Sequence, residues 1–139
     1  MWDTTSVPDG RYVVRVVASD APSNSPATAL TGDMESAAFD VDNVPPRIAV
    51  TSVQRQGGKT TVMFEVRDDM SAVQRVDYSL DGDRWAPVYP KDGIADSRVE
   101  QFELTLTEAQ ATAGVVLRAA DALNNVSSTR GSAPPQGGR

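Results

Sequence analysis

The chain has 139 residues and a formal net charge of −6, with 13 Lys and Arg against 19 Asp and Glu. Nucleic-acid binding rests largely on Lys and Arg that neutralise phosphates, and here these residues form no run, so we expect no nucleic-acid partner. The chain has no Cys, which excludes disulfides and thiol chemistry. No apolar run approaches the roughly 18 residues needed to cross a bilayer, so we expect no membrane insertion.

The first residues, Met1 to Thr5, carry neither the basic nor the apolar region of a signal peptide. We therefore expect the sequence to be a fragment, with any export signal outside it.

Residues 1–43 predict a β-hairpin. After a Pro8-Asp9-Gly10 turn, residues 11–19 alternate as a strand that places Tyr12, Val14, Val16 and Ala18 on one face. Residues 20–26 have the composition of a turn, a polar loop runs to about residue 35, and residues 37–41 form the returning strand.

A stiff joint is predicted at residues 44–46, which contain Pro45 and Pro46. Proline cannot donate to a β-ladder, and it forces the preceding residue into an extended conformation. A Pro-Pro pair between two apolar strands therefore indicates a boundary between domains.

The remaining chain predicts short strands separated by turns. Gly57-Gly58 indicates a hairpin turn, Pro87 restricts its strand to a sheet edge, and Thr107 can cap one helical turn over 107–111. The predicted strands are 48–54, 60–67, 76–80, 84–89, 98–106, 114–121 and 126–130. This spacing is typical of an antiparallel all-β sandwich over 47–130, and the Gly- and Pro-rich tail 131–139 is predicted to be disordered.

An internal repeat links the two parts of the chain. Residues 16–24 and 117–125 both fit the pattern apolar-x-Ala-x-Asp-Ala-x-x-Asn, at an offset of 101 residues. This spacing is about one sandwich domain and suggests tandem copies of one module. Residues 1–43 would then be the last hairpin of a truncated preceding copy. Two strands alone are marginally stable, so the hairpin should pack either on the second domain or on another copy of the chain.

Three motifs resemble bacterial immunoglobulin-like and fibronectin type III-like repeats. They are the strand start Pro8-Asp9-Gly10-Arg11-Tyr12, the turn Ala18-Ser19-Asp20, and the joint Asp42-Asn43-Val44-Pro45-Pro46. The resemblance implies an immunoglobulin/fibronectin type III-like sandwich, with Tyr12 as a tyrosine corner that bonds back to the backbone. In the second copy Ala113 stands at the position of Tyr12, so that corner is missing there.

A second likeness concerns residues 76–85, which are similar to sandwich modules that follow β-propellers in some bacterial sensors or are appended to secreted hydrolases. The resemblances together imply an extracellular or periplasmic, multi-domain bacterial parent. In such a parent this piece would be a spacer or a contact surface.

Catalysis is not expected. The chain has no His and no Cys, so the usual nucleophile–base pairs cannot form. The carboxylate pairs Asp68-Asp69 and Asp81-Asp83 lie in predicted turns, where Asp is favoured for its backbone hydrogen bonds.

The predicted joint carries candidate metal ligands. Asp40, Asp42 and Asn43 offer oxygen ligands of the kind that Ca²⁺ accepts, although Ca²⁺ takes about six to eight of them. Asp20 and Asp121, in contrast, are predicted to cap turns.

The aromatic candidates are Trp85 and Tyr89, which share parity on the predicted edge strand and could form a platform for a sugar or a peptide. Covering the sheet is the favoured use, because Trp is usually largely buried. Tyr78 alternates with Val76 and Leu80 and is assigned to the core.

Three functions stay open at this stage. The first is a non-catalytic spacer or protein-interaction module that contacts a protein partner, the neighbouring domains of its parent, or a second copy through the hairpin. The second is a carbohydrate-binding accessory module using Trp85 and Tyr89. The third is an adhesin segment stiffened by Ca²⁺.

Overall fold

The computed structural model describes residues 2–131 and divides the chain into two compact units, Met1–Asn43 and Val44–Arg139. The boundary falls at the start of the predicted joint 44–46. The predicted disordered tail lies outside the described residues, apart from Gly131. No helix within residues 2–131 is long and apolar enough to cross a membrane.

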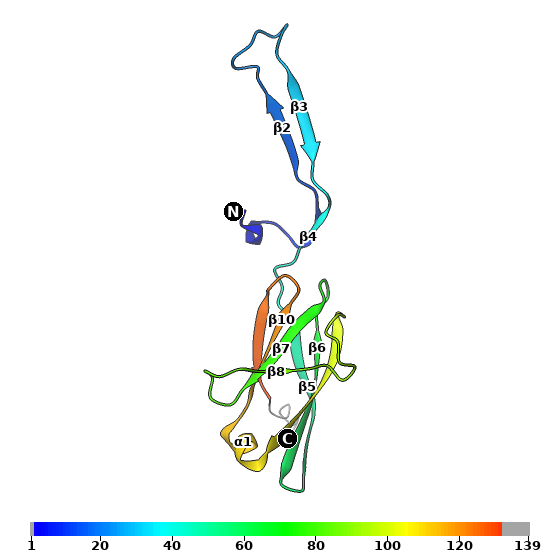
Figure 1. Ribbon diagram of the computed structural model, residues 1–139, viewed down its shortest axis with the longest axis vertical. Coiled ribbons are helices and arrows are strands. Elements are labelled where there is room, and N and C mark those ends of the chain that lie inside the picture. Colours follow the sequence, from blue (N-terminus) through cyan, green and yellow to red (C-terminus); the bar gives the residue numbers. More distant parts are fainter. Residues whose placement is uncertain (1, 132–139) are drawn as a thin grey trace, which may run out of the picture. The chain divides into compact units, whose positions relative to one another are not determined.

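The first unit is a long hairpin that pairs in two separate pieces (Figure 1). Nearer its base β1 pairs with β4, and beyond them β2 pairs with β3, both antiparallel. Its elements are a short 3-10 helix η1 (Thr4–Ser6) and the strands β1 (Gly10–Tyr12), β2 (Arg15–Ser19), β3 (Thr31–Glu35) and β4 (Phe39–Val41).

The predicted strand over 11–19 is interrupted, and one strand was not predicted. The backbone N–H of Val14 donates to the hydroxyl of Ser36 at 2.9 Å, so a side chain replaces a ladder partner between β1 and β2. The segment β3 was predicted as loop because Thr31-Gly32-Asp33-Met34-Glu35 shows no apolar alternation.

Asn43 fastens the N-terminal loop of the first unit to the end of its hairpin. Its side-chain amide donates to the carbonyl of Thr4 at 3.1 Å and to the carboxylate of Asp9 at 3.2 Å. Its backbone N–H donates to the same carboxylate at 2.9 Å. A long-range polar clamp therefore closes a unit that has little core.

The second unit is an all-β sandwich of two antiparallel sheets, as the spacing of the strands predicted (Figure 1). One sheet has the order β5-β6-β9 and the other the order β11-β10-β7-β8. The strands are β5 (Arg47–Gln56), β6 (Lys59–Arg67), β7 (Val73–Ser79), β8 (Ala86–Val88), β9 (Val99–Thr107), β10 (Val116–Asp121) and β11 (Val126–Arg130). The chain passes from one sheet to the other after β6, β8 and β9.

Alternating side chains of the two sheets meet in one core. Phe64 and Phe102 face each other across β6 and β9 with their rings stacked 5.1 Å apart. Val62, Val66, Leu104 and Leu106 complete the inward stripes of these two strands, and the opposite sheet adds Val76, Leu117 and Ala119. The buried residues of β6 and β9 thus alternate along each strand.

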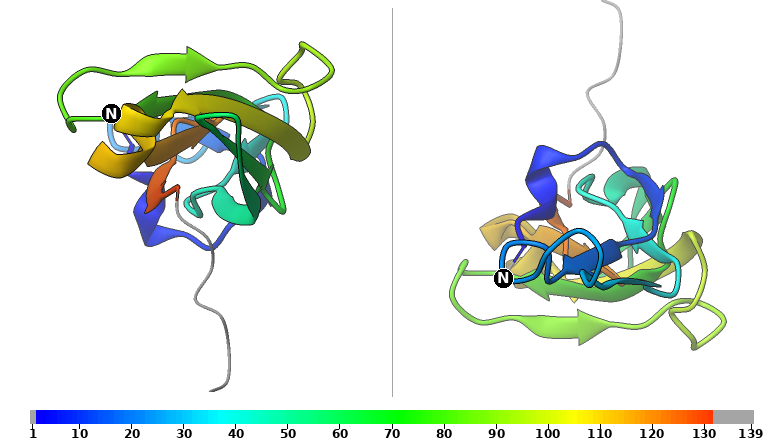
Figure 2. Two further views of the ribbon diagram at one scale, coloured as in Figure 1. Left: turned by 90° about the horizontal axis from the view of Figure 1, so that it is seen from below. Right: turned by 90° about the horizontal axis from the view of Figure 1, so that it is seen from above.

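Local turn and cap residues fix the ends of these strands. Gly57 and Gly58 have positive φ angles of 61° and 75°, which a tight two-residue hairpin between β5 and β6 requires. Helix α1 (Glu108–Ala113) begins after Thr107, whose hydroxyl accepts from the N–H of Gln110 as predicted for an N-cap. Strand β8 is shorter than predicted, and it pairs with β7 alone within residues 2–131, at the margin of the second unit (Figure 2).

Candidate functional site

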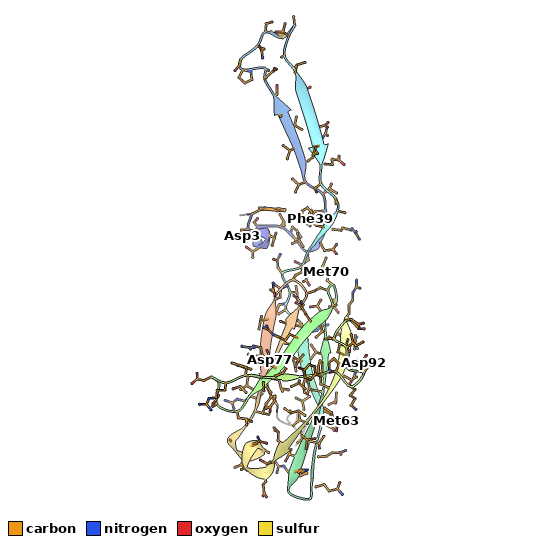
Figure 3. All side chains as sticks on the ribbon, viewed as in Figure 1. Asp3, Phe39, Met63, Met70, Asp77 and Asp92 are labelled. Atoms are coloured by element: carbon orange, nitrogen blue, oxygen red, sulfur yellow. The ribbon has the colours of Figure 1, made fainter. Side chains whose placement is uncertain are left out.

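An exposed apolar surface lies on one side of the β2–β3 hairpin. We call it the hairpin face, and it consists of Val14, Val16, Ala18 and Met34. Val16 and Met34 are directly opposed across the two strands, and they are 61% and 76% exposed. The face lines a shallow groove of about 540 Å³. No other described segment of the first unit covers it (Figure 3).

The opposite side of the same hairpin is more polar. Arg15 and Asp33 form an ion pair there, and Glu35 stands opposite Arg15 in the ladder. Val17 lies on this side as well and is 64% exposed. The hairpin is therefore amphipathic although both of its sides meet solvent within the first unit.

The sequence pattern that residues 16–24 share with residues 117–125 gives the hairpin face a buried counterpart. At an offset of 101 residues, Val14, Val16 and Ala18 correspond to Val115, Leu117 and Ala119 of the second unit. Those three residues are 7%, 0% and 0% exposed and belong to the sandwich core. The same apolar pattern is thus buried by a second sheet in one unit and uncovered in the other.

Unpaired strand edges accompany the exposed face. Within the described residues β2 pairs only with β3, and β3 only with β2. The outer N–H and C=O groups of such a hairpin are open to pairing with another strand. This surface can accept an apolar partner and a β-strand together.

The predicted aromatic pair is divided between two environments. The guanidinium of Arg118 lies 3.8 Å from the ring centre of Trp85, so Trp85 covers the outside of the β10 sheet. Tyr89 is 71% exposed and lines a groove of about 330 Å³ with Pro87, Pro90 and Ile94. Neither aromatic residue lies within β8, in contrast to the predicted strand over 84–89.

The predicted metal ligands of the joint also differ from one another. Asp40 is exposed on β4 opposite Arg11, Asp42 is buried just after β4, and the amide of Asn43 is engaged by the N-terminal loop. Pro46 is fully buried, and its carbonyl accepts a hydrogen bond from the hydroxyl of Ser127 on β11.

The residues predicted to have structural roles make local backbone contacts. The hydroxyl of Tyr12 donates to the carbonyl of Pro8 at 2.6 Å, which is the bond of a tyrosine corner. The carboxylate of Asp20 accepts from the N–H of Leu30, and that of Asp121 accepts from the N–H groups of Leu123 and Asn125. Ala113, the counterpart of Tyr12, is the last residue of α1.

Turn hydrogen bonds also shift the acidity of exposed carboxylates. The backbone N–H groups of Arg84 and Asp83 hold the pKa of Asp81 below its ordinary value. The hydroxyl and N–H of Thr5 do the same for the pKa of Asp3. Both carboxylates act as acceptors that stabilise a turn, as expected for Asp in these positions.

No protein-family model matches the chain, and neither a curated protein nor a solved structure matches it. The hairpin face therefore has to be interpreted from its own chemistry. Sequence reasoning placed Val14, Val16 and Ala18 on one side of a strand but did not single out that side as a surface. The signal that identifies it is their alignment with three residues of the second unit.

Proposed function

We propose that the chain is a non-catalytic spacer and protein-contact module of an exported, multi-domain bacterial protein. The sandwich of the second unit would be the rigid spacer, and the hairpin face of the first unit would be the contact surface. Immunoglobulin-like and fibronectin type III-like modules share this two-sheet architecture, which supports the resemblance of the sequence motifs.

One observation carries the proposal: the hairpin face is exposed whereas its repeat counterpart is core. Burying a Val or Met side chain stabilises a structure by about 1.5–3 kcal/mol, so covering Val14, Val16 and Met34 would be favourable. Exposed apolar patches of this kind mark sites of protein association.

The occupant that we propose is the hairpin of a second copy. Two copies present the same apolar face and the same open edges, so a symmetric contact can satisfy both at once. Pairing of strands would supply backbone hydrogen bonds, and the facing Val and Met side chains would supply burial. A localisation outside the cytoplasm, in the periplasm or beyond, is part of the same proposal.

Sedimentation velocity over a range of concentrations tests this contact. We expect the wild-type chain to dimerise with rising concentration and the Val16→Asp variant to stay monomeric, because a buried unpaired charge is costly. Val17→Asp is the matched control, since Val17 is the next residue, is 64% exposed and points to the other side. A wild-type chain that is monomeric throughout, or equal losses in both variants, would contradict the proposal.

A second candidate function rests on Tyr89, whose exposed ring lines a groove at the margin of the second unit. Aromatic rings in open grooves can stack on sugars, so a carbohydrate-binding role would use Tyr89, with Trp85 nearby in sequence. Titrating the tryptophan fluorescence with a panel of polysaccharides checks this role. A response that Tyr89→Ala removes supports it, and a flat response across the panel counts against it.

A further inference from the structure

Two loops at one end of the sandwich each begin with a buried aspartate. Asp68 opens the loop between β6 and β7, and Asp121 opens the turn between β10 and β11. The N–H of Ala122 donates to the carbonyl of Ala72 at 2.9 Å, and Asp121 is the ladder partner of Val73. Met70, in the first loop, lies at the end of the second unit away from α1 (Figures 1 and 3). The two loops are thus held together by the β7–β10 ladder.

Hydrogen bonds within the turns satisfy one carboxylate oxygen of Asp68 and both carboxylate oxygens of Asp121. Oδ1 of Asp68 accepts from the N–H groups of Met70 and Ser71, both at 2.8 Å. Oδ1 of Asp121 accepts from two backbone N–H groups, and its Oδ2 accepts from the side-chain amide of Asn125 at 2.9 Å. These bonds are what an aspartate at the start of a loop is expected to make.

The other oxygen of Asp68 has no such explanation. Its Oδ2 is buried and has no hydrogen-bond partner, in a residue that is 5% exposed. Asp121 is 0% exposed, and one carboxylate oxygen of each residue lies within 4.8 Å of the other. No Lys or Arg of residues 2–131 forms an ion pair with either carboxylate. Two buried negative charges at this separation repel each other, and an unsatisfied buried oxygen adds a desolvation cost.

We propose that Asp68 and Asp121 bind a divalent cation, and that this cation is Ca²⁺. Ca²⁺ lies about 2.3–2.6 Å from its oxygen ligands, so two oxygens on one ion can be separated by up to about 5 Å. The observed separation fits this limit, and the ion would neutralise both charges and give Oδ2 of Asp68 its partner.

Ca²⁺ is proposed because of the type of donor atom and because of the place of the two aspartates in the fold. Carboxylate oxygens suit hard cations, and the chain has no His or Cys to favour zinc. Ligands at the start of loops tolerate the irregular geometry of Ca²⁺, whereas Mg²⁺ demands a near-ideal octahedron and retains several waters. Backbone carbonyls and water would complete the coordination. Both proposed ligands lie in the second unit, so their role can be tested independently of the hairpin contact.

Thermal unfolding with and without Ca²⁺ tests the site. The full chain carrying Trp2→Phe makes Trp85 the single tryptophan, so its fluorescence reports the second unit. With Ca²⁺ about a hundredfold above its dissociation constant, we expect the melting temperature to exceed that in EDTA by about 10 °C. Mg²⁺ at the same concentration should give a smaller shift. No shift with Ca²⁺ would overturn the proposal, and an equal or larger shift with Mg²⁺ would overturn the assignment to Ca²⁺.

The variant Asp68→Asn locates the ion. It keeps the oxygen that accepts from Met70 and Ser71 but replaces the unpartnered oxygen with an uncharged amide. In EDTA it should melt at the same temperature as the parent or higher, because one of two facing charges is gone, and it should lose the Ca²⁺ shift.

Asp69→Asn is the matched control for that variant. Asp69 is the adjacent carboxylate, but it is exposed and pairs with Arg47 at 3.2 Å. Its replacement should leave the Ca²⁺ shift intact. A shift that persists in Asp68→Asn, or one that Asp69→Asn removes equally, would place the ion elsewhere and contradict the site.

Discussion

Strands β2 and β10 carry the same apolar pattern in two different settings. Val16 and Leu117 occupy the same position of the shared sequence pattern, yet one is 61% exposed and the other 0%. In the second unit the sheet β5-β6-β9 covers Leu117, whereas within the first unit no described strand stands opposite Val16. The burial of a strand is therefore decided by the sheet that packs on it and not by its own alternation.

The segments that lead into β2 and β10 are stabilised in two different ways. The first unit uses the tyrosine corner of Tyr12 before β2, and the second uses the capped helix α1 before β10. Tyr12 does so with a hydrogen bond from its side chain to the backbone, and α1 does so with the capping bonds of Thr107 and Gln110. The two units thus share the sequence pattern of a strand and its turn aspartate, but the segment before the strand differs.

The largest expected effect contrasts the two equivalent apolar positions. Leu117→Ala should lower the free energy of unfolding of the second unit by about 2–5 kcal/mol, because it leaves a cavity in a closed core. Val16→Ala should change the stability of a monomeric chain by no more than about 0.5 kcal/mol. Urea titrations at low concentration, with Trp2 or Trp85 as the single tryptophan, measure each unit separately. Similar losses of unfolding free energy in Leu117→Ala and Val16→Ala would contradict the difference between the two strands.

A medium effect concerns the segments that lead into β2 and β10. Tyr12→Phe removes the bond to the carbonyl of Pro8 and should destabilise the first unit by about 0.5–1.5 kcal/mol. Thr107→Ala removes the cap of α1 and should destabilise the second unit by about 1 kcal/mol. The same single-tryptophan titrations check whether each change stays within its own unit. Loss of stability in the other unit would show that the tyrosine corner and the capped helix do not act locally.

The smallest effect is a dependence on pH. Because the pKa of Asp81 is lower in the folded protein than its ordinary value, its contribution to stability is present above the unfolded pKa of about 3.9. That contribution is lost as pH falls through the lower folded pKa. Melting temperatures of the second unit between pH 5 and pH 2.5 should therefore fall less in Asp81→Asn than in the wild type.

Asp3 should behave in the same way in the first unit, since hydrogen bonds from Thr5 lower its pKa as well. Asp3→Asn should flatten the pH profile of that unit and leave that of the second unit unchanged. Identical profiles for the wild type and both variants would contradict these assignments.

The sandwich could be predicted from sequence because its signals are local. Val62, Phe64 and Val66 alternate with more polar residues and are buried, Gly57-Gly58 marked a turn, and Thr107 marked a helix start. Strand β3 could not be predicted, because its pairing with β2 rests on register and not on its own composition.

The candidate sites were less accessible to sequence reasoning. Asp68 was interpreted as a turn residue, and its Oδ1 does accept turn hydrogen bonds, but only the fold brings its carboxylate near that of Asp121. Trp85 was considered for ligand binding, and its contact with Arg118 depends on the pairing of β7 with both β8 and β10. Contacts between residues far apart in the chain decided both cases.

Hydrogen–deuterium exchange at two protein concentrations tests the central claim most directly. If the hairpin face is a contact surface between copies, the amides of β2 and β3 should exchange more slowly at the higher concentration, and those of β10 should not change. Exchange rates in β2 and β3 that are independent of concentration would contradict the account.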